Sequence, residues 1–318
     1  METNTSVKAV NQPSATRQVK ARANKKVPVN WRDAFWGYIL IAPAFIFIIG
    51  FTFIPVIGAF GISLTKWDLL SQAEFIGFDN YQRIFSDNVA TKTLLNTFYY
   101  TFVSVPLGII ISLLLASLLN QKIRGLAIFR TFYYLPVISS TVAVSMIFRW
   151  VLDSQYGMLN GGLAIFGISP IPWLTDPAWA MPAVILVTVW RSLGFNMLVL
   201  LAALQDVPKE LHEAAAMDGA TAFHKFFYVS IPLITPAIFF VTMTSLINSF
   251  QSFDLVYNMT QGGPARATSL IGYYLWEQAF KYLNMGYGAA IAFVLFFFIL
   301  VITFVQWVLR RKWVFGEE

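Results

Sequence analysis

Between two long apolar segments, residues Gln205–Pro236 read QDVPKELHEAAAMDGATAFHKFFYVSIPLITP. The part Lys209–Met217 consists mostly of residues with high helix propensity, and Asp206 stands where its carboxylate can cap the start of a helix. Gly219 stands where this helix should end, because glycine adopts the positive φ of a helix C-terminus without strain. A second short amphipathic helix is expected over Thr221–Val229. The stretch therefore predicts a helix–turn–helix knob between two membrane spans, and the alternative is an ordinary connecting loop.

The composition of the whole chain excludes a water-soluble fold. Hydrophobic residues make up 57% of the 318 residues, charged residues make up 12%, and the mean hydropathy is +0.63. A soluble domain carries about a quarter charged residues, so most of this surface must face lipid. The chain has no cysteine, which excludes disulfides, thiol nucleophiles and thiolate metal sites.

Six segments with little or no charge are long enough to cross a bilayer, which takes about 20 apolar residues. They are Ala34–Thr65, Thr93–Gln121, Thr131–Phe148, Ala178–Leu204, Phe226–Phe253 and Tyr282–Leu309. Every backbone amide in lipid must bond within its own segment, so these segments are predicted helices. The predicted fold is all-α: a polytopic membrane domain of six transmembrane helices over residues 34–309, with a cytoplasmic loop at residues 205–232.

Lysine and arginine are concentrated on one side of this predicted topology. They crowd the N-terminal tail (residues 1–33), the loops after the second and fourth spans, and the C-terminal tail (residues 310–318). Basic residues mark cytoplasmic loops, so both termini and the knob are predicted to lie in the cytoplasm. This bias also accounts for the net charge of +6 without a nucleic-acid partner.

The motifs of common catalytic and cofactor sites are absent from the sequence. No G-x-x-x-x-G-K-[ST] occurs, so the chain does not bind ATP through a P-loop. His212-Glu213 begins like a zinc-protease motif, but position 216 is Ala216 rather than histidine. No Ser/His/Asp arrangement is visible. The sequence therefore predicts a protein that is not an enzyme, with no catalytic residue, no metal site and no cofactor of its own.

The knob also resembles a known family motif. The groups Glu213-Ala214-Ala215, Asp218-Gly219-Ala220 and Val229-x-Ile231-Pro232 are similar to the EAA loop of bacterial binding-protein-dependent ABC permeases. The family pattern ends I-x-L-P, so the valine and the isoleucine here are conservative departures. The resemblance implies that the loop docks on a separate ABC ATPase dimer, which binds ATP and Mg. It assigns the coupling role to Glu213, Ala214, Ala215, Asp218 and Gly219.

Two further segments resemble carbohydrate permeases. Met259–Pro264, with the signature Gly262, Gly263 and Pro264, is similar to an external loop of that group, and Phe75–Tyr81 is similar to another such segment. The resemblance runs from about residue 36 to 307 and is to the six-span sugar and glycerol-phosphate permeases of the MalF type. It implies a MetI/MalF-like fold in a bacterial cytoplasmic (inner) membrane. The implied partners are a second, homologous permease chain, the ATPase dimer and an extracytoplasmic solute-binding protein that delivers a carbohydrate.

Candidate cargo-binding residues lie in the fourth and fifth spans. Arg191 is a charge at bilayer depth, where charged side chains usually face a cavity or a partner. Asn248, Gln251 and Ser252 are spaced to share a helical face beside Ser249, and Phe195, Phe250 and Phe253 offer rings for a sugar to stack on. The resemblance adds Thr141 and Ser192 to the pathway candidates. The alternative is that these polar side chains only bond helices to one another.

The favoured function is therefore that of a permease subunit that moves a sugar or oligosaccharide into the cell. One rival is the same machine with glycerol phosphate or a polyol as cargo. A rival from another class is a secondary transporter or channel that works alone, which would often show ionisable residues in several spans.

Overall fold

The computed structural model describes residues 31–120 and 126–316. Within these ranges four continuous helices are long and apolar enough to cross a membrane, and two pairs of helices bent at a break would raise the number to six. The six segments expected from the sequence thus correspond to four continuous helices and two bent pairs. The chain divides into two compact units, residues 1–57 and residues 58–318.

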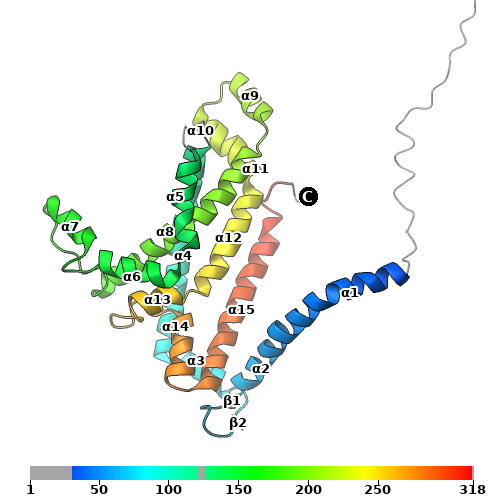
Figure 1. The fold of residues 1–318 in the computed structure, drawn as a ribbon, viewed down its shortest axis with the longest axis vertical. Helices are drawn as coiled ribbons and strands as arrows, with labels where there is room; N and C mark the ends of the chain where they lie inside the picture. Colours follow the sequence, from blue (N-terminus) through cyan, green and yellow to red (C-terminus); the bar gives the residue numbers. More distant parts are fainter. Residues whose placement is uncertain (1–30, 121–125, 317–318) are drawn as a thin grey trace, which may run out of the picture. The chain divides into compact units, whose positions relative to one another are not determined.

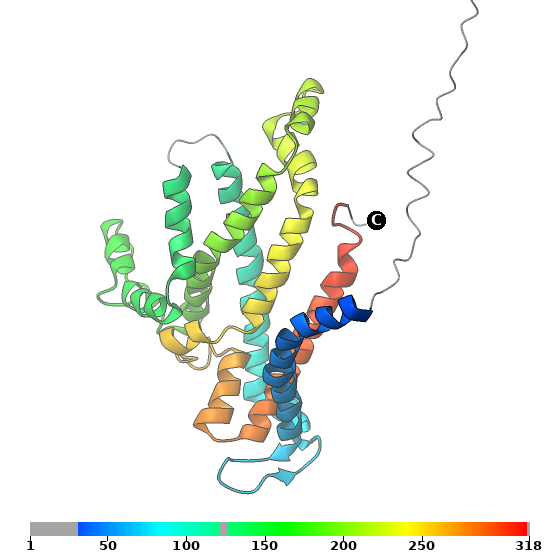
Figure 2. The ribbon, with the colours of Figure 1, turned by 45° about the vertical axis from the view of Figure 1, so that its right-hand side comes forward.

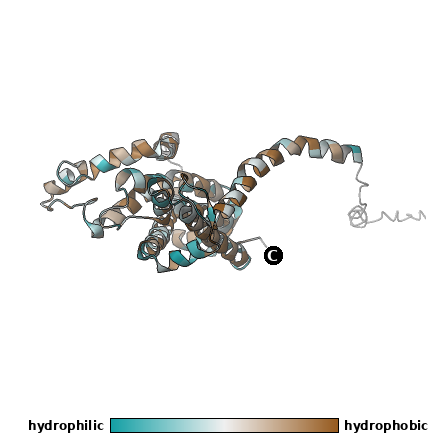
Figure 3. Cartoon of the chain, turned by 90° about the horizontal axis from the view of Figure 1, so that it is seen from below, coloured by the Kyte–Doolittle hydropathy of each residue, from teal (hydrophilic) through white to brown (hydrophobic). Residues whose placement is uncertain are grey.

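The described part of the first unit, from Trp31 onward, is a run of apolar helix. It contains α1 (Trp31–Ile48), the π-helical turn η2 (Ile49–Phe53) and the start of α2 (Ile54–Ser63). The stretch Ala34–Ser63 forms a candidate span in which no residue of the most apolar part is buried. Hydrophobic residues cover most of this helix (Figure 3). An unburied apolar helix is stable only where lipid or another protein covers it.

A small hairpin follows α2 in the second unit. Strand β1 (Thr65–Lys66) pairs antiparallel with β2 (Glu74–Phe75). The buried side chain of Asn80 donates hydrogen bonds to the carbonyl groups of Ser63 and Thr65, at 2.9 and 2.8 Å. Asn80 lies in α3 (Asp79–Ser86), so this helix holds the base of the hairpin.

The longest helix, α4 (Asn88–Leu119), packs against α8 (Pro177–Gln205). Each begins at an aspartate, because Asp87 and Asp176 accept hydrogen bonds from the first free N–H groups of their helices. Glycine permits the close approach: a Cβ on Gly108 would lie 3.2 Å from the Ser192 hydroxyl.

The third predicted span is bent. Helix α5 (Leu126–Ile138) contains Pro136, and its part from Thr131 makes an angle of 107° with α6 (Thr141–Val151). Proline lacks the N–H that would bond the preceding turn, which explains a break nearby. The short helix α7 (Met158–Ile165) follows.

The knob region follows α8 as α9 (Lys209–Met217), α10 (Ala222–Lys225), the π-helical turn η3 (Phe226–Ser230) and α11 (Ile231–Leu233). Helix α12 (Thr235–Phe250) then leaves at 68° to the stretch Ala222–Leu233. The fifth predicted span is therefore bent at Ile234, between the two prolines of that region.

The chain ends with α13 (Asp254–Met259), α14 (Ile271–Trp276), η4 (Glu277–Lys281) and α15 (Met285–Arg310). Beyond α15 the backbone folds back onto α12. The N–H of Phe315 donates to the Thr235 hydroxyl at 2.9 Å, and the Trp313 ring lies 6.0 Å from that of Phe239.

The core of the second unit lies where α4, α8, α12 and α15 pack together. Its largest fully buried side chains include Tyr100, Phe250 and Met197. Both views place α9 and α10 at one end of this unit and the β1–β2 hairpin with α3 at the opposite end (Figures 1 and 2). Apolar helices lie between these two ends, which we call the knob pole and the hairpin pole.

Candidate functional site

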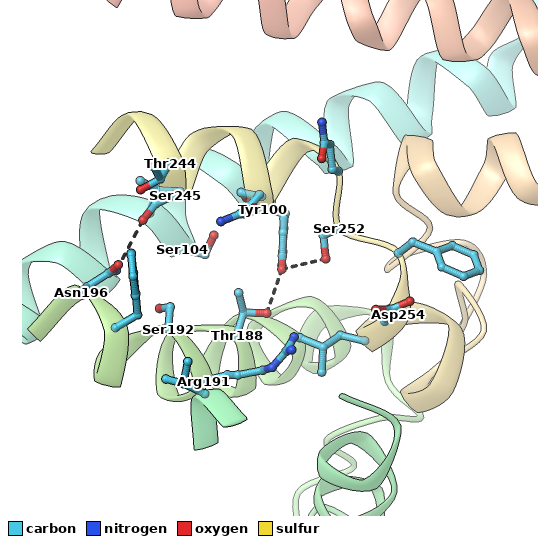
Figure 4. A pocket seen from close by; sticks show the side chains of 18 residues that line it. Tyr100, Ser104, Thr188, Arg191, Ser192, Asn196, Thr244, Ser245, Ser252 and Asp254 are labelled. Carbon is cyan, nitrogen blue, oxygen red and sulfur yellow. Dashed lines mark hydrogen bonds between the residues drawn. The ribbon is translucent and has the colours of Figure 1, made fainter. Parts of the chain in front are cut away.

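A polar cavity of about 560 Å³ opens among α4, α8 and the end of α12. A cavity lined by so many hydroxyl and amide groups is unusual between apolar helices, where each uncompensated polar group is costly. The polar and charged side chains that line it are Tyr100, Ser104, Thr188, Arg191, Ser192, Asn196, Thr244, Ser245, Asn248, Ser249, Gln251, Ser252 and Asp254. Figure 4 shows most of them around the cavity.

Tyr100 joins three of the elements around the cavity. Its side chain is almost fully buried in α4, and its hydroxyl lies 2.8 Å from that of Thr188 in α8. The same hydroxyl lies 3.1 Å from that of Ser252, just beyond α12 (Figure 4). A second bond, of 3.4 Å, runs from the Asn196 amide to the Ser245 hydroxyl. These bonds fix the spacing of the helices and therefore the width of the cavity.

Arg191 brings a permanent positive charge to this cavity. It lies midway along α8, and within the described parts of the chain neither a hydrogen bond nor an ion pair joins it to another residue. Asp254, at the start of α13, also lines the cavity. A guanidinium with free donors beside an open polar space is placed to bind a polar or anionic guest.

Most of the predicted pathway residues meet at this cavity. Its lining contains the predicted residues Arg191, Ser192, Phe195, Asn248, Ser249, Gln251 and Ser252. Thr141 is not among the lining residues, because the sharp bend before α6 carries it elsewhere. The part that the cavity-lining residues play in transport stays a prediction.

The geometry of the predicted polar stripe differs from the expectation. Helix α12 ends at Phe250, so Gln251 and Ser252 lie beyond it and do not continue the face that begins at Asn248. Phe250 is 1% exposed and packs edge-on against Phe98, so its ring is not available to stack on a guest.

Sequence reasoning missed several cavity residues, and Ser249 combines the predicted position with a bond between helices. The Ser249 hydroxyl donates to Thr101 at 2.9 Å, so this serine bonds two helices in addition to lining the cavity. Tyr100, Thr188 and Asn196 were not identified as candidates. The signal that could have found them is a polar side chain within an apolar span, since such groups must face a partner or a cavity.

The knob has the predicted helix, turn and helix. Gly219 has φ of +79°, and the N–H groups of Gly219 and Ala220 donate to the carbonyl groups of Ala216 and Ala215. These two bonds form the Schellman ending of a helix, which favours glycine at this point. Of the predicted coupling residues, Glu213, Ala214, Asp218 and Gly219 are exposed and Ala215 is half-buried.

One detail of the knob prediction was wrong. Helix α9 begins after Pro208 without a side-chain cap, and Asp206 instead ends α8, so it does not cap the knob. The second helix, expected over Thr221–Val229, begins after Thr221, whose side chain caps α10, and continues as the π-helical turn η3 to Ser230.

The Gly262, Gly263 and Pro264 segment is an ordered loop against α4. Gly262 has φ of +77°, and a Cβ there would lie 2.9 Å from the Tyr273 ring. Lys92 donates to the carbonyl of Ala265, and Asn96 donates to those of Arg266 and Ser269. The loop backbone is therefore held by polar side chains of α4.

Charged side chains brace the same end of the molecule. The carboxylate of Glu277 pairs with Arg266 at 2.8 Å and with Lys281 at 3.2 Å, and the bond to Glu277 raises the pKa of Lys281. Asp87 accepts hydrogen bonds from the hydroxyls of Tyr274 and Tyr287, at 2.6 and 2.7 Å. Burial raises the pKa of Asp87, but these two bonds and those from the α4 N-terminus outweigh burial and hold it below 3.8.

The family model for the binding-protein-dependent transport system inner membrane component matches residues 85–314, which contain the cavity, the knob and the loop of Gly262. The chain belongs to this family. In residues 31–120 and 126–316, no group of three or more histidine, aspartate or glutamate residues is placed to hold a metal ion.

Relatives of this inner membrane component share most of its length. The lactose transport system permease protein LacF of Rhizobium radiobacter is 36% identical over 282 residues, covering 87% of this chain and 94% of LacF. The trehalose/maltose transport system permease protein MalF of Thermococcus litoralis is 34% identical over 278 residues, covering 87% and 93%. Among solved structures, a chain of a bacterial alginate ABC transporter bound to its periplasmic protein superposes with a TM-score of 0.79 at 23% identity, over 88% of this chain and 96% of that one. That likeness shows that the inner membrane component has the ABC permease fold.

Proposed function

We propose that this chain is the permease subunit of a carbohydrate importer in a bacterial cytoplasmic membrane, and that its cargo passes through the cavity beside Arg191 and Tyr100. The observation that most supports this proposal is a cavity of about 560 Å³ among apolar helices, lined by hydroxyl, amide and charged side chains. Sugars need many donors and acceptors together with an apolar surface for their ring faces. Phe195 and Phe253 line the same space and supply that surface.

The knob is proposed to couple the permease to a separate ATPase. Its small exposed Ala214 lets another protein approach the backbone of α9 closely, and Met217 at the tip is 88% exposed. Large exposed apolar side chains of this kind mark a surface that a partner covers. The ATPase dimer would bind ATP and Mg and close around them. The knob would transmit this movement of the ATPase to α12, which lines the cargo cavity.

The two poles of the second unit then face opposite compartments. The knob pole and both termini lie in the cytoplasm, and the hairpin pole lies outside, where an extracytoplasmic binding protein delivers the sugar. A second permease chain, homologous to this one, completes the pathway and covers the apolar surfaces that this chain leaves open. The switch between inward and outward states needs ligand contacts that differ between the two states.

Arg191 favours one alternative cargo. A free guanidinium beside the cavity suits an anionic group, so glycerol phosphate is the second candidate, carried by the same machine. The relatives named for lactose and for trehalose and maltose favour a sugar.

The test is uptake into vesicles that contain the complete transporter. Labelled lactose, trehalose, maltose, arabinooligosaccharides, a polyol and glycerol phosphate are each offered with the binding protein and internal ATP. We expect uptake of a sugar that requires both. If only glycerol phosphate were taken up, the proposed cargo would be wrong and the assignment as an ATP-driven importer would stand. Uptake by this chain without any ATPase would refute the proposal and favour a secondary transporter.

A further inference from the structure

Most of the hydroxyl groups that line the cargo cavity have already used their only proton. A hydroxyl group has one O–H donor and two acceptor lone pairs, whereas a backbone carbonyl can only accept. The hydroxyl groups that donate to a carbonyl of their own helix, each at 2.9 Å, are those of Thr188, Ser192 and Thr244. The Ser249 hydroxyl donates to Thr101. These groups therefore meet a guest in the cavity as hydrogen-bond acceptors only.

The hydrogen bonds of Tyr100 extend the same restriction to Ser252. Because the Thr188 proton is bound by the Val184 carbonyl, the 2.8 Å bond between Thr188 and Tyr100 must have Tyr100 as its donor. Tyr100 then has no proton left, so the 3.1 Å bond between Tyr100 and Ser252 must have Ser252 as its donor (Figure 4). The protons point in one direction, from Ser252 to Tyr100 to Thr188 to a carbonyl. Ser252 therefore keeps only lone pairs for the cavity.

Strong donors are fewer on this wall than acceptors. Asp254 lines the cavity with a carboxylate, which accepts only. Arg191 is the cavity residue that donates only, and no described residue accepts from it. The lining residues that can offer both a donor and an acceptor are Ser104, Asn196, Ser245, Asn248 and Gln251. Much of the wall thus requires a guest that donates, and Arg191 can donate to an oxygen of that guest.

This balance of donors and acceptors distinguishes two chemical classes of cargo. Each free hydroxyl group of a sugar can donate one hydrogen bond and accept others. A phosphate dianion brings acceptors only, so at Ser252 and Asp254 its oxygens would face lone pairs. A buried acceptor that is left without a donor loses the stabilisation that water gave it. Arg191 alone could not compensate for both mismatches.

We propose that the cavity selects its cargo as a hydrogen-bond donor, a neutral saccharide with a free hydroxyl group that donates to Ser252. Tyr100 is the positioning residue that fixes this polarity. It is 1% exposed and acts through Ser252, whose proton it holds away from the cargo. The inference rests on the proposed function and narrows it, because it favours a neutral sugar over glycerol phosphate.

The test replaces single hydroxyl groups of the cargo by fluorine, which has a similar size but cannot donate a hydrogen bond. The complete transporter is placed in vesicles with its ATPase subunits and its binding protein. The probe is lactose, trehalose, maltose or an arabinooligosaccharide, whichever the wild type takes up, together with its monofluorinated analogues. The measured quantity is the fluorine penalty, which we define as kcat/KM for uptake of the sugar divided by that of the analogue.

Two variants release the Ser252 proton by different routes. Tyr100→Phe removes the group that accepts this proton. Thr188→Val keeps the shape of the side chain but removes the acceptor of the Tyr100 proton, so that Tyr100 can donate to Ser252 instead. The control, Tyr81→Phe, removes a tyrosine hydroxyl that lies 2.7 Å from the Ser63 hydroxyl and does not line the cavity.

We expect a wild-type fluorine penalty of about tenfold or more for the analogue that lacks the hydroxyl bound by Ser252. The penalty should fall to about threefold or less in both variants, because Ser252 can then donate, and should keep its wild-type value in the control. The binding protein and the partner permease are the same throughout, so their own preferences cancel in the comparison. A merely structural role of Tyr100 would lower uptake of the sugar and of its analogues alike and leave the penalty unchanged.

A penalty that is absent from the wild type, or that is the same in the wild type and the variants, would overturn this inference and leave the importer intact. Uptake of glycerol phosphate in place of a sugar would also overturn it. Subunit recovery is measured throughout, and if one variant does not assemble, the other decides. Failure of the proposed function looks different: the wild-type complex would then take up no sugar in a manner that depends on ATP and the binding protein, and both proposals would fall together.

Discussion

Substitution of Gly219 by valine gives the sharpest test of the knob. Gly219 has φ of +79°, and a Cβ built on it meets no atom within 4 Å. The cost of Gly219→Val is therefore one of backbone conformation and not of collision. Left-handed backbone costs an L-residue about 1–2 kcal/mol, which lowers the population of the native turn about fivefold to thirtyfold.

The expected result is a permease that folds but couples poorly. A turn that leaves the left-handed conformation breaks the bonds from Gly219 and Ala220 to the end of α9, so the two short helices no longer keep their angle. The assay measures subunit recovery, ATP hydrolysis stimulated by the loaded binding protein, and uptake. We expect all three to fall together, and Gly219→Asn to keep much more activity, because asparagine tolerates positive φ.

Gly316 offers a matched control within the same chain. Its φ is +85°, and its Cβ position is also free of neighbours, but it lies beyond α15 and outside the knob. Gly316→Val should therefore carry the same backbone cost without loss of stimulated ATP hydrolysis. Full coupling in Gly219→Val, or an equal loss in Gly316→Val, would refute the assignment of the coupling role to the knob.

Three further predictions concern the cavity, the hairpin pole and the topology. Arg191→Met should lower uptake several-fold with unchanged subunit recovery, and normal uptake would place the cargo site mainly in the partner permease. Asp87→Asn should destabilise the protein at neutral pH, because it removes a charged acceptor of two tyrosine hydroxyls. The folded pKa of Asp87 lies below 3.8, so the charge of Asp87 contributes to folding stability above that value. This contribution is lost as the pH falls through the folded pKa. If thermal unfolding showed the same destabilisation by Asp87→Asn at such acid pH, the prediction would be contradicted. In this cysteine-free chain, Leu70→Cys should react with an impermeant maleimide from outside and Met217→Cys should not, and labelling of both from outside would invert the topology.

The helical content and the location of the apolar segments could be predicted because the bilayer imposes a simple rule on both length and composition. The bends could not be placed in the same way. Pro136 and Pro232 indicate where a helix can break. The angles of 107° and 68°, however, depend on which neighbours pack on each half of the helix. That is a tertiary property, and a bend is invisible to a count of apolar residues.

The residues of the cavity, too, could be predicted only in part. Arg191 and Ser252 were found because a polar residue in an apolar span is conspicuous, and both line the cavity. Tyr100 was missed because tyrosine is also common in spans as an interfacial anchor, and only the position of its hydroxyl between two other elements reveals its place. Phe250 was misassigned because the sequence cannot tell which side of a helix end faces the core.

Helix α15 gives the two poles a common mechanical element. Its first turn carries Tyr287 beneath Arg83 of α3, and just past its last turn the backbone N–H of Phe315 is bonded to Thr235, the first residue of α12. The helix is unbroken over 26 residues, about 39 Å at 1.5 Å per residue. It is therefore one continuous connection between α3, at the hairpin pole, and the first residue of α12.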